Sequence, residues 1–167
     1  ENTFDLWLGK EFGSGNQLVI SNGGTVLASN CWIGFGPTGS NTLVAVSGGN
    51  LLVTNVNRSA QVFIGRSPGC SLTVNGGLLE TDFLFVTNHW KQPNNEFKLN
   101  YGQVRLRSAF VKTGNAVSVG DGTNQATLEL RVNGTNSFFN GLRVESNSIL
   151  TGDGSIVANV TNTDGGT

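Results

Sequence analysis

Two carboxylates, Glu80 and Asp82, are the residues of this sequence best suited to acid–base chemistry, because they lie two positions apart in a strand-like segment. Glycosidases act with two carboxylates placed across the scissile sugar bond. Two arginines, Arg105 and Arg107, repeat the same spacing further along the chain. The charges therefore allow a catalytic pair or two ion pairs, Glu80–Arg105 and Asp82–Arg107, between neighbouring strands. We favour the ion pairs, each worth roughly a few tenths of a kcal/mol, and expect no enzymatic activity.

A polar loop, TNHWKQPNNE at residues 87–96, holds the single histidine of the chain. Long loops on repeat proteins project from one edge and often carry the binding function. His89, Trp90 and Lys91 are therefore a candidate contact site, and a merely decorative loop is the alternative. His89 has no Cys, Asp or second His near it in the sequence, so we predict neither a metal site nor a cofactor.

The segment SVGDGTNQ, residues 118–125, loosely resembles the calcium-binding repeats of β-roll proteins. Those repeats need aspartates that recur in tandem. Asp121 and Asp153 stand alone, so the sequence argues against a calcium site here.

The two cysteines, Cys31 and Cys70, fall at different points of a repeat that runs through the chain. Either they are two small buried apolar residues or they form a disulfide, and we favour the first interpretation. Two cysteines are too few for a disulfide scaffold or a structural zinc site.

The repeat that contains all of these residues is seen best in WIGFGPTGSNTLVAVSGGNLLVTN, residues 32–55. The order is an apolar start with Ile-Gly, a polar loop, a short Val/Leu strand, a Gly-Gly turn and a second strand. The same order occurs before it at residues 7–30 and after it at residues 63–82. A supersecondary unit repeated at this length indicates a solenoid or a propeller.

Two series of residues mark the period of the repeat. The turn glycines recur at intervals between 20 and 32 residues, at Gly24, Gly49, Gly77, Gly102, Gly134 and more weakly Gly154. The strand starts give the second series, at Gly9, Gly34, Gly65, Val86, Gly120 and Glu145. This period is too short for propeller blades. The sequence therefore predicts an all-β fold, a parallel and right-handed β-helix (β-solenoid) of about six coils with three short strands per coil.

We expect a single domain over residues 1–167, with coils at about 7–31, 32–62, 63–83, 84–117, 118–141 and 142–167. Alternation after each turn glycine should point Val53 and Leu106 inward, and Leu27 and Leu52 outward. Trp7 and Trp32 hold the same place in successive coils. They are expected to stack as an aromatic ladder, and a platform for carbohydrate is the alternative.

The composition excludes several classes of function. The net charge is −1 and the charges are scattered, so we predict no nucleic-acid partner. No apolar run is long enough for a membrane helix, and we predict no membrane insertion. The chain has no Met, which suggests a processed product or a piece of a longer protein. Abundant Asn, Ser, Thr and Gly, with little Lys and Glu, favour an extracellular or cell-surface location.

The Ile-Gly, loop, Leu-Val, Gly-Gly pattern of residues 32–55 resembles the autotransporter-associated and PEP-CTERM-associated β-strand repeat proteins. The final run ILTGDGSIVANVTNTDGGT, residues 149–167, is similar to the closing motif of such passengers. The resemblance covers most of the chain and implies a secreted or surface-exposed bacterial β-helix with adhesive or structural roles. It supplies no catalytic residues, and family members are commonly far longer.

We therefore expect a non-enzymatic structural protein, part of a filament or an adhesive surface matrix, whose partners are copies of itself. The alternative is a module that binds or acts on polysaccharide, with surface glycans as partners. A β-helix without caps offers unpaired backbone at both ends, and such edges template another strand. The opening strand, with Phe4, Leu6 and Trp7, is the predicted assembly edge. A longer solenoid whose next coils cover these edges is the competing interpretation.

Overall fold

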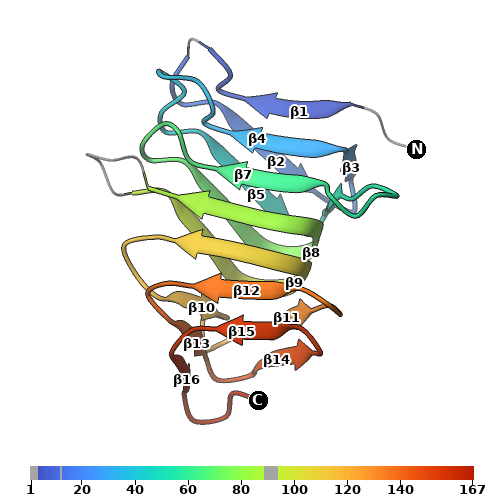
Figure 1. Ribbon diagram of the computed structural model, residues 1–167, viewed down its shortest axis with the longest axis vertical. Helices are drawn as coiled ribbons and strands as arrows, with labels where there is room; N and C mark the ends of the chain where they lie inside the picture. Colours follow the sequence, from blue (N-terminus) through green and yellow to red (C-terminus); the bar gives the residue numbers. More distant parts are fainter. Residues whose placement is uncertain (1–3, 12, 89–93) are drawn as a thin grey trace.

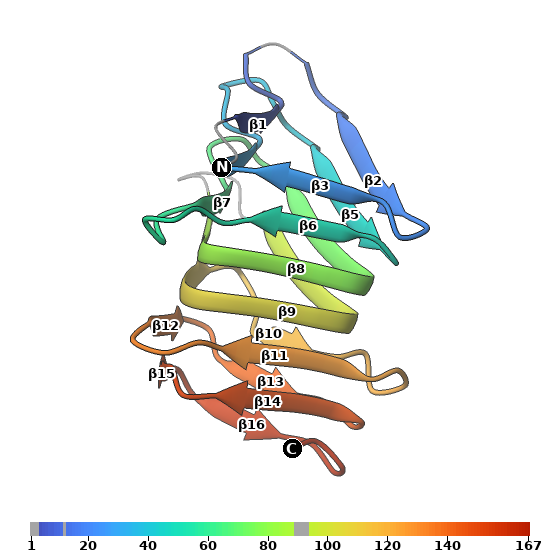
Figure 2. The ribbon, with the colours of Figure 1, turned by 90° about the vertical axis from the view of Figure 1, so that its right-hand side faces the viewer.

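The computed structural model describes residues 4–11, 13–88 and 94–167, and over these ranges the chain is all-β with no helix. Sixteen strands form one sheet whose ladders are parallel, and the sheet winds around a common axis into a β-solenoid of about six coils (Figure 1). Followed from the N-terminus to the C-terminus in Figures 1 and 2, the coils turn in the right-handed sense. The predicted fold class is confirmed.

Each coil has three faces, on which the strands of successive coils stack. Face A contains β1 (Asp5–Leu8), β4 (Asn30–Ile33), β7 (Gln61–Ile64), β12 (Thr135–Phe138) and β15 (Ser155–Val157). Face B contains β2 (Gln17–Ser21), β5 (Leu43–Ser47), β10 (Val117–Val119), β13 (Leu142–Val144) and β16 (Val160–Asn162). Face C contains β3 (Thr25–Ala28), β6 (Asn50–Val53), β11 (Ala126–Leu130) and β14 (Ser148–Gly152). Two long strands, β8 (Ser71–Thr87) and β9 (Glu96–Lys112), run through faces B, C and A in turn.

The backbone register confirms the first four turn glycines and corrects the rest of that series. At the corner between faces B and C, four glycines stack as predicted: Gly24, Gly49, Gly77 and Gly102. Gly102 then pairs with Ala126, so the predicted next member, Gly134, is wrong. Gly134 and Gly154 stack on each other at a different corner, between faces C and A, because the residues that follow them pair.

The strand-start series also changes face. Gly9, Gly34 and Gly65 follow paired residues at the end of face A, as predicted. Gly120 and Glu145 follow paired residues at the end of face B instead, so their place in that series is wrong. Corner loops of different lengths cause both errors, since a glycine at the right interval can belong to another corner.

Face C shows how side chains alternate between the core and the surface. Val53 and Leu106 are fully buried, whereas Leu27 is 59% exposed and Leu52 is half-buried. The predicted inward and outward positions are therefore confirmed. Apolar inward residues from all three faces form one continuous core along the axis.

The Gly-Gly corner is explained by close backbone contact between coils. Gly77 has a φ of +79°, and a Cβ built on it would lie only 1.9 Å from the carbonyl oxygen of Gly49. Glycine alone combines this conformation with so close an approach.

The inward and outward positions of face C give a first prediction. Leu106→Ala should lower the free energy of unfolding by about 2–5 kcal/mol, because it removes apolar contacts and leaves a cavity in a packed core. Leu27→Ala on the same face is the matched control, and it should change stability by less than about 0.5 kcal/mol. Chemical denaturation followed by circular dichroism measures both. Equal losses for the two variants would contradict the register.

Candidate functional site

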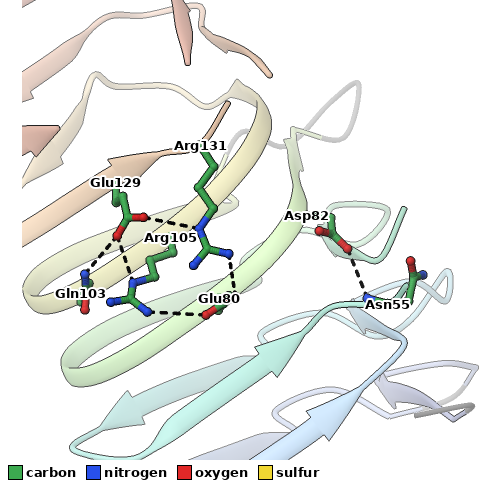
Figure 3. A network of polar contacts seen from close by, with 7 residues as sticks. All are labelled: Asn55, Glu80, Asp82, Gln103, Arg105, Glu129 and Arg131. Atoms are coloured by element: carbon green, nitrogen blue, oxygen red, sulfur yellow. Dashed lines mark hydrogen bonds and ion pairs between the residues drawn. The ribbon is translucent and has the colours of Figure 1, made fainter. Parts of the chain in front are cut away.

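Four charged residues on the outer side of face C form a closed network (Figure 3). Glu80 lies 3.8 Å from Nη1 of Arg105 and 2.7 Å from Nη1 of Arg131. Glu129 lies 3.0 Å from Nε of Arg105 and 3.4 Å from Nε of Arg131. Nε of Arg105 is not aligned for a hydrogen bond, so its contact with Glu129 is ionic. The predicted Glu80–Arg105 ion pair is present, within a larger arrangement.

Each member of this network has more than one partner. The amide of Gln103 also donates to Oε2 of Glu129 at 3.3 Å. Partial burial disfavours the charged guanidinium of Arg131, but hydrogen bonds and charge from Glu80 and Glu129 outweigh it and raise the pKa of Arg131. Both carboxylates are therefore held as ion-paired acceptors, which does not suit a general acid or base.

The predicted Asp82–Arg107 ion pair is wrong. Oδ2 of Asp82 accepts the backbone N–H groups of Asn55 and Ala60, each at 3.3 Å, and so fixes the base of the loop between β6 and β7 (Figure 3). Arg107 donates instead to the carbonyl oxygen of Val132 at 3.4 Å. Asp82 and Arg107 lie opposite each other in the strand register. Each side chain instead forms hydrogen bonds with backbone groups at a neighbouring corner.

Sequence reasoning missed two members of the network, Glu129 and Arg131. Arg131 contacts Glu80 across 51 residues, from two coils away. Glu129 could have been found from the strand register, since it pairs with Arg105, but the glycine series placed its coil wrongly.

Asp121 forms a turn instead of a calcium repeat. Its Oδ1 accepts the backbone N–H groups of Thr123 at 2.8 Å and Asn124 at 2.9 Å. These bonds lower the pKa of Asp121 to about 2. Within residues 4–11, 13–88 and 94–167, no three His, Cys, Asp or Glu side chains are grouped so as to hold a metal ion.

An aromatic row runs along the outer side of face A. Trp7 and Trp32 stack with ring centroids 5.1 Å apart and planes at 17°, which confirms the predicted ladder. The row continues through three phenylalanines in register, Phe63, Phe85 and Phe110, and ends at Phe139. Phe63 was recognisable in the sequence, because it opens the third copy of the repeat as Trp7 and Trp32 open the first two.

The row does not present a platform for sugars. Carbohydrate stacking needs a free ring face, and the faces of Trp32 and Phe85 are directed at their neighbours in the row. Lys10 lies over the ring of Trp7, with Nζ 5.0 Å from its centroid. The geometry therefore favours a role in holding coils together.

Both cysteines are free and fully buried, as we favoured. Burial raises the pKa of the Cys31 thiol to about 12. Burial also raises the pKa of Cys70, whose Sγ lies 3.3 Å from the carbonyl oxygen of Gly39. Neither thiol is suited to act as a nucleophile.

The predicted contact residues His89, Trp90 and Lys91 lie outside the described residues. The residues of the predicted assembly edge, Phe4, Leu6 and Trp7, lie within the described residues. Leu6 and Trp7 pair with Cys31 and Trp32 on one side of β1, and Phe4 just before it is 77% exposed.

At the two ends of the described residues the core is only partly covered. The strands of the first coil, β1, β2 and β3, each pair with one other strand, and so do the last strands of the three faces, β14, β15 and β16. Seven apolar side chains that pack on the core are only partly buried, and all lie in or beside these end strands: Leu6, Leu8, Leu18, Val26, Leu150, Ile156 and Ala158. Residues 165–167 already bond to β14, since the N–H of Leu150 donates to the carbonyl oxygen of Thr167 at 2.7 Å. The ends therefore present apolar side chains together with outer edges of β1, β2, β3, β15 and β16 that no described strand pairs with.

No family model, curated protein or solved structure matches the chain. The resemblance to autotransporter-associated and PEP-CTERM-associated repeats therefore stays a prediction. Over the part of the chain that the structure describes, no helix is long and apolar enough to cross a membrane.

The network on face C yields a second prediction. Glu80→Gln should lower the free energy of unfolding by about 1 kcal/mol at low salt, because two arginines lose their shared acceptor, and by less at high salt. Glu96→Gln is the matched control. It breaks a single, more exposed pair with Lys98 and should cost less, although that pair is shorter at 2.6 Å. Denaturation at two salt concentrations measures both, and equal, salt-independent losses would contradict the network.

The Asp121 turn yields a third prediction. Because the folded pKa is depressed, the stabilisation from this carboxylate is fully present above its ordinary pKa of about 3.9 and is lost as the pH falls through about 2. The carboxyl carbon shift of Asp121, followed by NMR, should therefore titrate near pH 2 in the folded protein. In urea the same carboxyl should titrate near about 3.9. Titration at this ordinary value in the folded state would show that the turn does not form.

Proposed function

We propose that this protein is a non-enzymatic structural β-solenoid that stacks head to tail on copies of itself, in a filament or a surface matrix outside the cell. The observation that carries the proposal is the set of partly buried apolar side chains at both ends, beside strand edges that no described strand pairs with. The ends are where the partly buried apolar side chains gather, and exposed apolar patches joined to free strand edges favour association.

The ends are suited to each other because a further coil would continue the same pattern. The last strands run parallel to the first ones, so the edge of β15 can pair with β1 of a second copy without reversing direction. Inward residues such as Ile156 and Leu6 would then meet across the junction. This contact joins unlike surfaces, and heterologous contact that does not close into a ring produces a fibre.

A non-enzymatic role is supported by the state of the acidic residues. Glu80 and Glu129 are held by arginines, Asp82 by backbone N–H groups at the base of a loop, and Asp121 by its own turn. Groups held in this way have structural partners and no free position toward a substrate.

Assembly is the fourth prediction. The purified protein should form linear particles in light scattering and negative-stain microscopy. Val160→Lys should prevent this, because Val160 lies at the open end, in register with the buried Leu142. Val19→Lys is the matched control. Both valines are 49% exposed, but Val19 points sideways from face B, so filaments should persist.

A mixing experiment separates head-to-tail contact from other association. Leu6→Lys blocks one end and Val160→Lys blocks the other, so each variant alone should be a monomer. Mixed in equal amounts, they should form a 1:1 dimer and nothing larger, because one free head meets one free tail. A wild-type protein that stays monomeric at high concentration would overturn the proposal, as would a Val19 variant that blocks assembly equally well.

A further inference from the structure

One coil-to-coil ladder is interrupted on face B. β10 pairs with β13 at three residue pairs, but it meets β9 only at Val119↔Leu99. The beginning of β10 is held by the next coil instead, since the N–H of Val117 donates to the carbonyl oxygen of Gly141 at 3.0 Å. The first residues of β9 and the turn before β10 therefore lie apart.

The space between them is a cleft of about 490 Å³, which is lined by residues 94–100 on one side and 113–118 on the other. This volume is in the range of sites for small ligands. Phe97, Leu99 and Val117 line it but are at most 5% exposed, so they offer little apolar surface. What remains accessible is polar and apolar in about equal parts.

The upper wall of the cleft, formed by residues 94–100, is held by hydrogen bonds of Asn95 and Glu96. Asn95 is buried, accepts the N–H of Cys70 at 2.8 Å and donates to the carbonyl oxygen of Thr87 at 2.8 Å. The N–H of Glu96 is bonded to the preceding coil. Because backbone groups alternate in a parallel strand, the N–H and C=O of Phe97 point the other way, toward the next coil. The one register pair between β9 and β10 lies further along, at Val119↔Leu99.

The accessible side chains supply both donors and acceptors. Asn94 and Asn115 are exposed amides on opposite walls. Glu96 and Lys98 project from the upper wall and pair with each other at 2.6 Å, so the cleft carries no net charge from them. The hydroxyl of Thr113 donates to the carbonyl oxygen of Asn115 at 2.7 Å and stiffens the lower wall.

We propose that this cleft binds one neutral sugar unit of a glycan. Hydroxyl groups both donate and accept hydrogen bonds, which matches the amides and the paired carboxylate and ammonium, and the C–H groups of a sugar match the apolar part of the lining. Among the described lining residues the one cation, Lys98, is paired with Glu96, so an anion is not favoured. An added β-strand would need a row of free backbone groups, and β9 is already paired with β10 at Leu99. This site is on the side of the solenoid and is independent of stacking at the ends.

The fifth prediction tests the site by NMR titration of labelled protein in the Val160→Lys background, which is blocked at one end. The probes are methyl glucoside, methyl galactoside, methyl mannoside and N-acetylglucosamine. At least one should cause saturable amide shifts confined to residues 94–100 and 113–118. Asn115→Ala should weaken that binding about fivefold to tenfold, which corresponds to one lost hydrogen bond. Ala116→Trp should fill the cleft and abolish binding.

Asn57→Ala, an exposed asparagine on another corner, is the matched control and should bind as the parent does. Unchanged amide shifts away from the cleft show that each variant is folded. The proposal is overturned if none of the four sugars gives saturable shifts, or if Asn115→Ala and Asn57→Ala bind equally well. Saturable shifts at residues 94–100 from an extended peptide, with none from sugars, would also overturn it.

Discussion

Parallel backbone pairing places every residue of a coil about 4.8 Å from its counterpart in the next coil, and this spacing constrains all of the side chains. A residue in a coil therefore lies directly above one neighbour and below another. Inside, the constraint favours apolar side chains at each level, as in the column Leu51, Leu79, Val104 and Leu128. At the corner before face C it favours glycine, because the backbones come too close for a Cβ.

On the outer faces the same spacing has two solutions. Residues of the same type can stack when they are aromatic, as in the row on face A that begins at Trp7. Like charges cannot stack at this distance. Face C accordingly alternates the sign of charge in one column, Glu80, Arg105 and Glu129, and Arg131 then joins the two carboxylates. Both arrangements link coils that are far apart in the sequence, and neither needs a ligand.

The groups of this fold that are available for binding a partner lie where the pairing of strands between coils is interrupted. This pairing stops at the two ends, where partly buried apolar side chains and free strand edges support the proposed stacking. It also stops along part of face B, where β10 is held by the coil after it and separates from β9. The ends present apolar side chains beside strand edges, whereas the cleft lies on the side of the solenoid and is about half polar. The two places therefore suit different partners, another solenoid and a polar small ligand.

The sequence by itself determined the fold class, the inward and outward positions of face C and the Trp7–Trp32 stack, because all three depend on local alternation and on repeats that can be aligned directly. It also located Glu80 opposite Arg105, since the glycines that set that register are regular as far as Gly102. Only the tertiary structure decided the arrangement beyond that glycine. Corner loops of unequal length moved Gly120 and Gly134 to other corners, and they hid the contact of Arg131 with Glu80. Asp82 and Arg107 form hydrogen bonds with backbone groups at the corners. The start of β10 is hydrogen-bonded to the next coil. Such choices depend on which unpaired polar group lies nearest in space, and spacing along the chain carries no information about that.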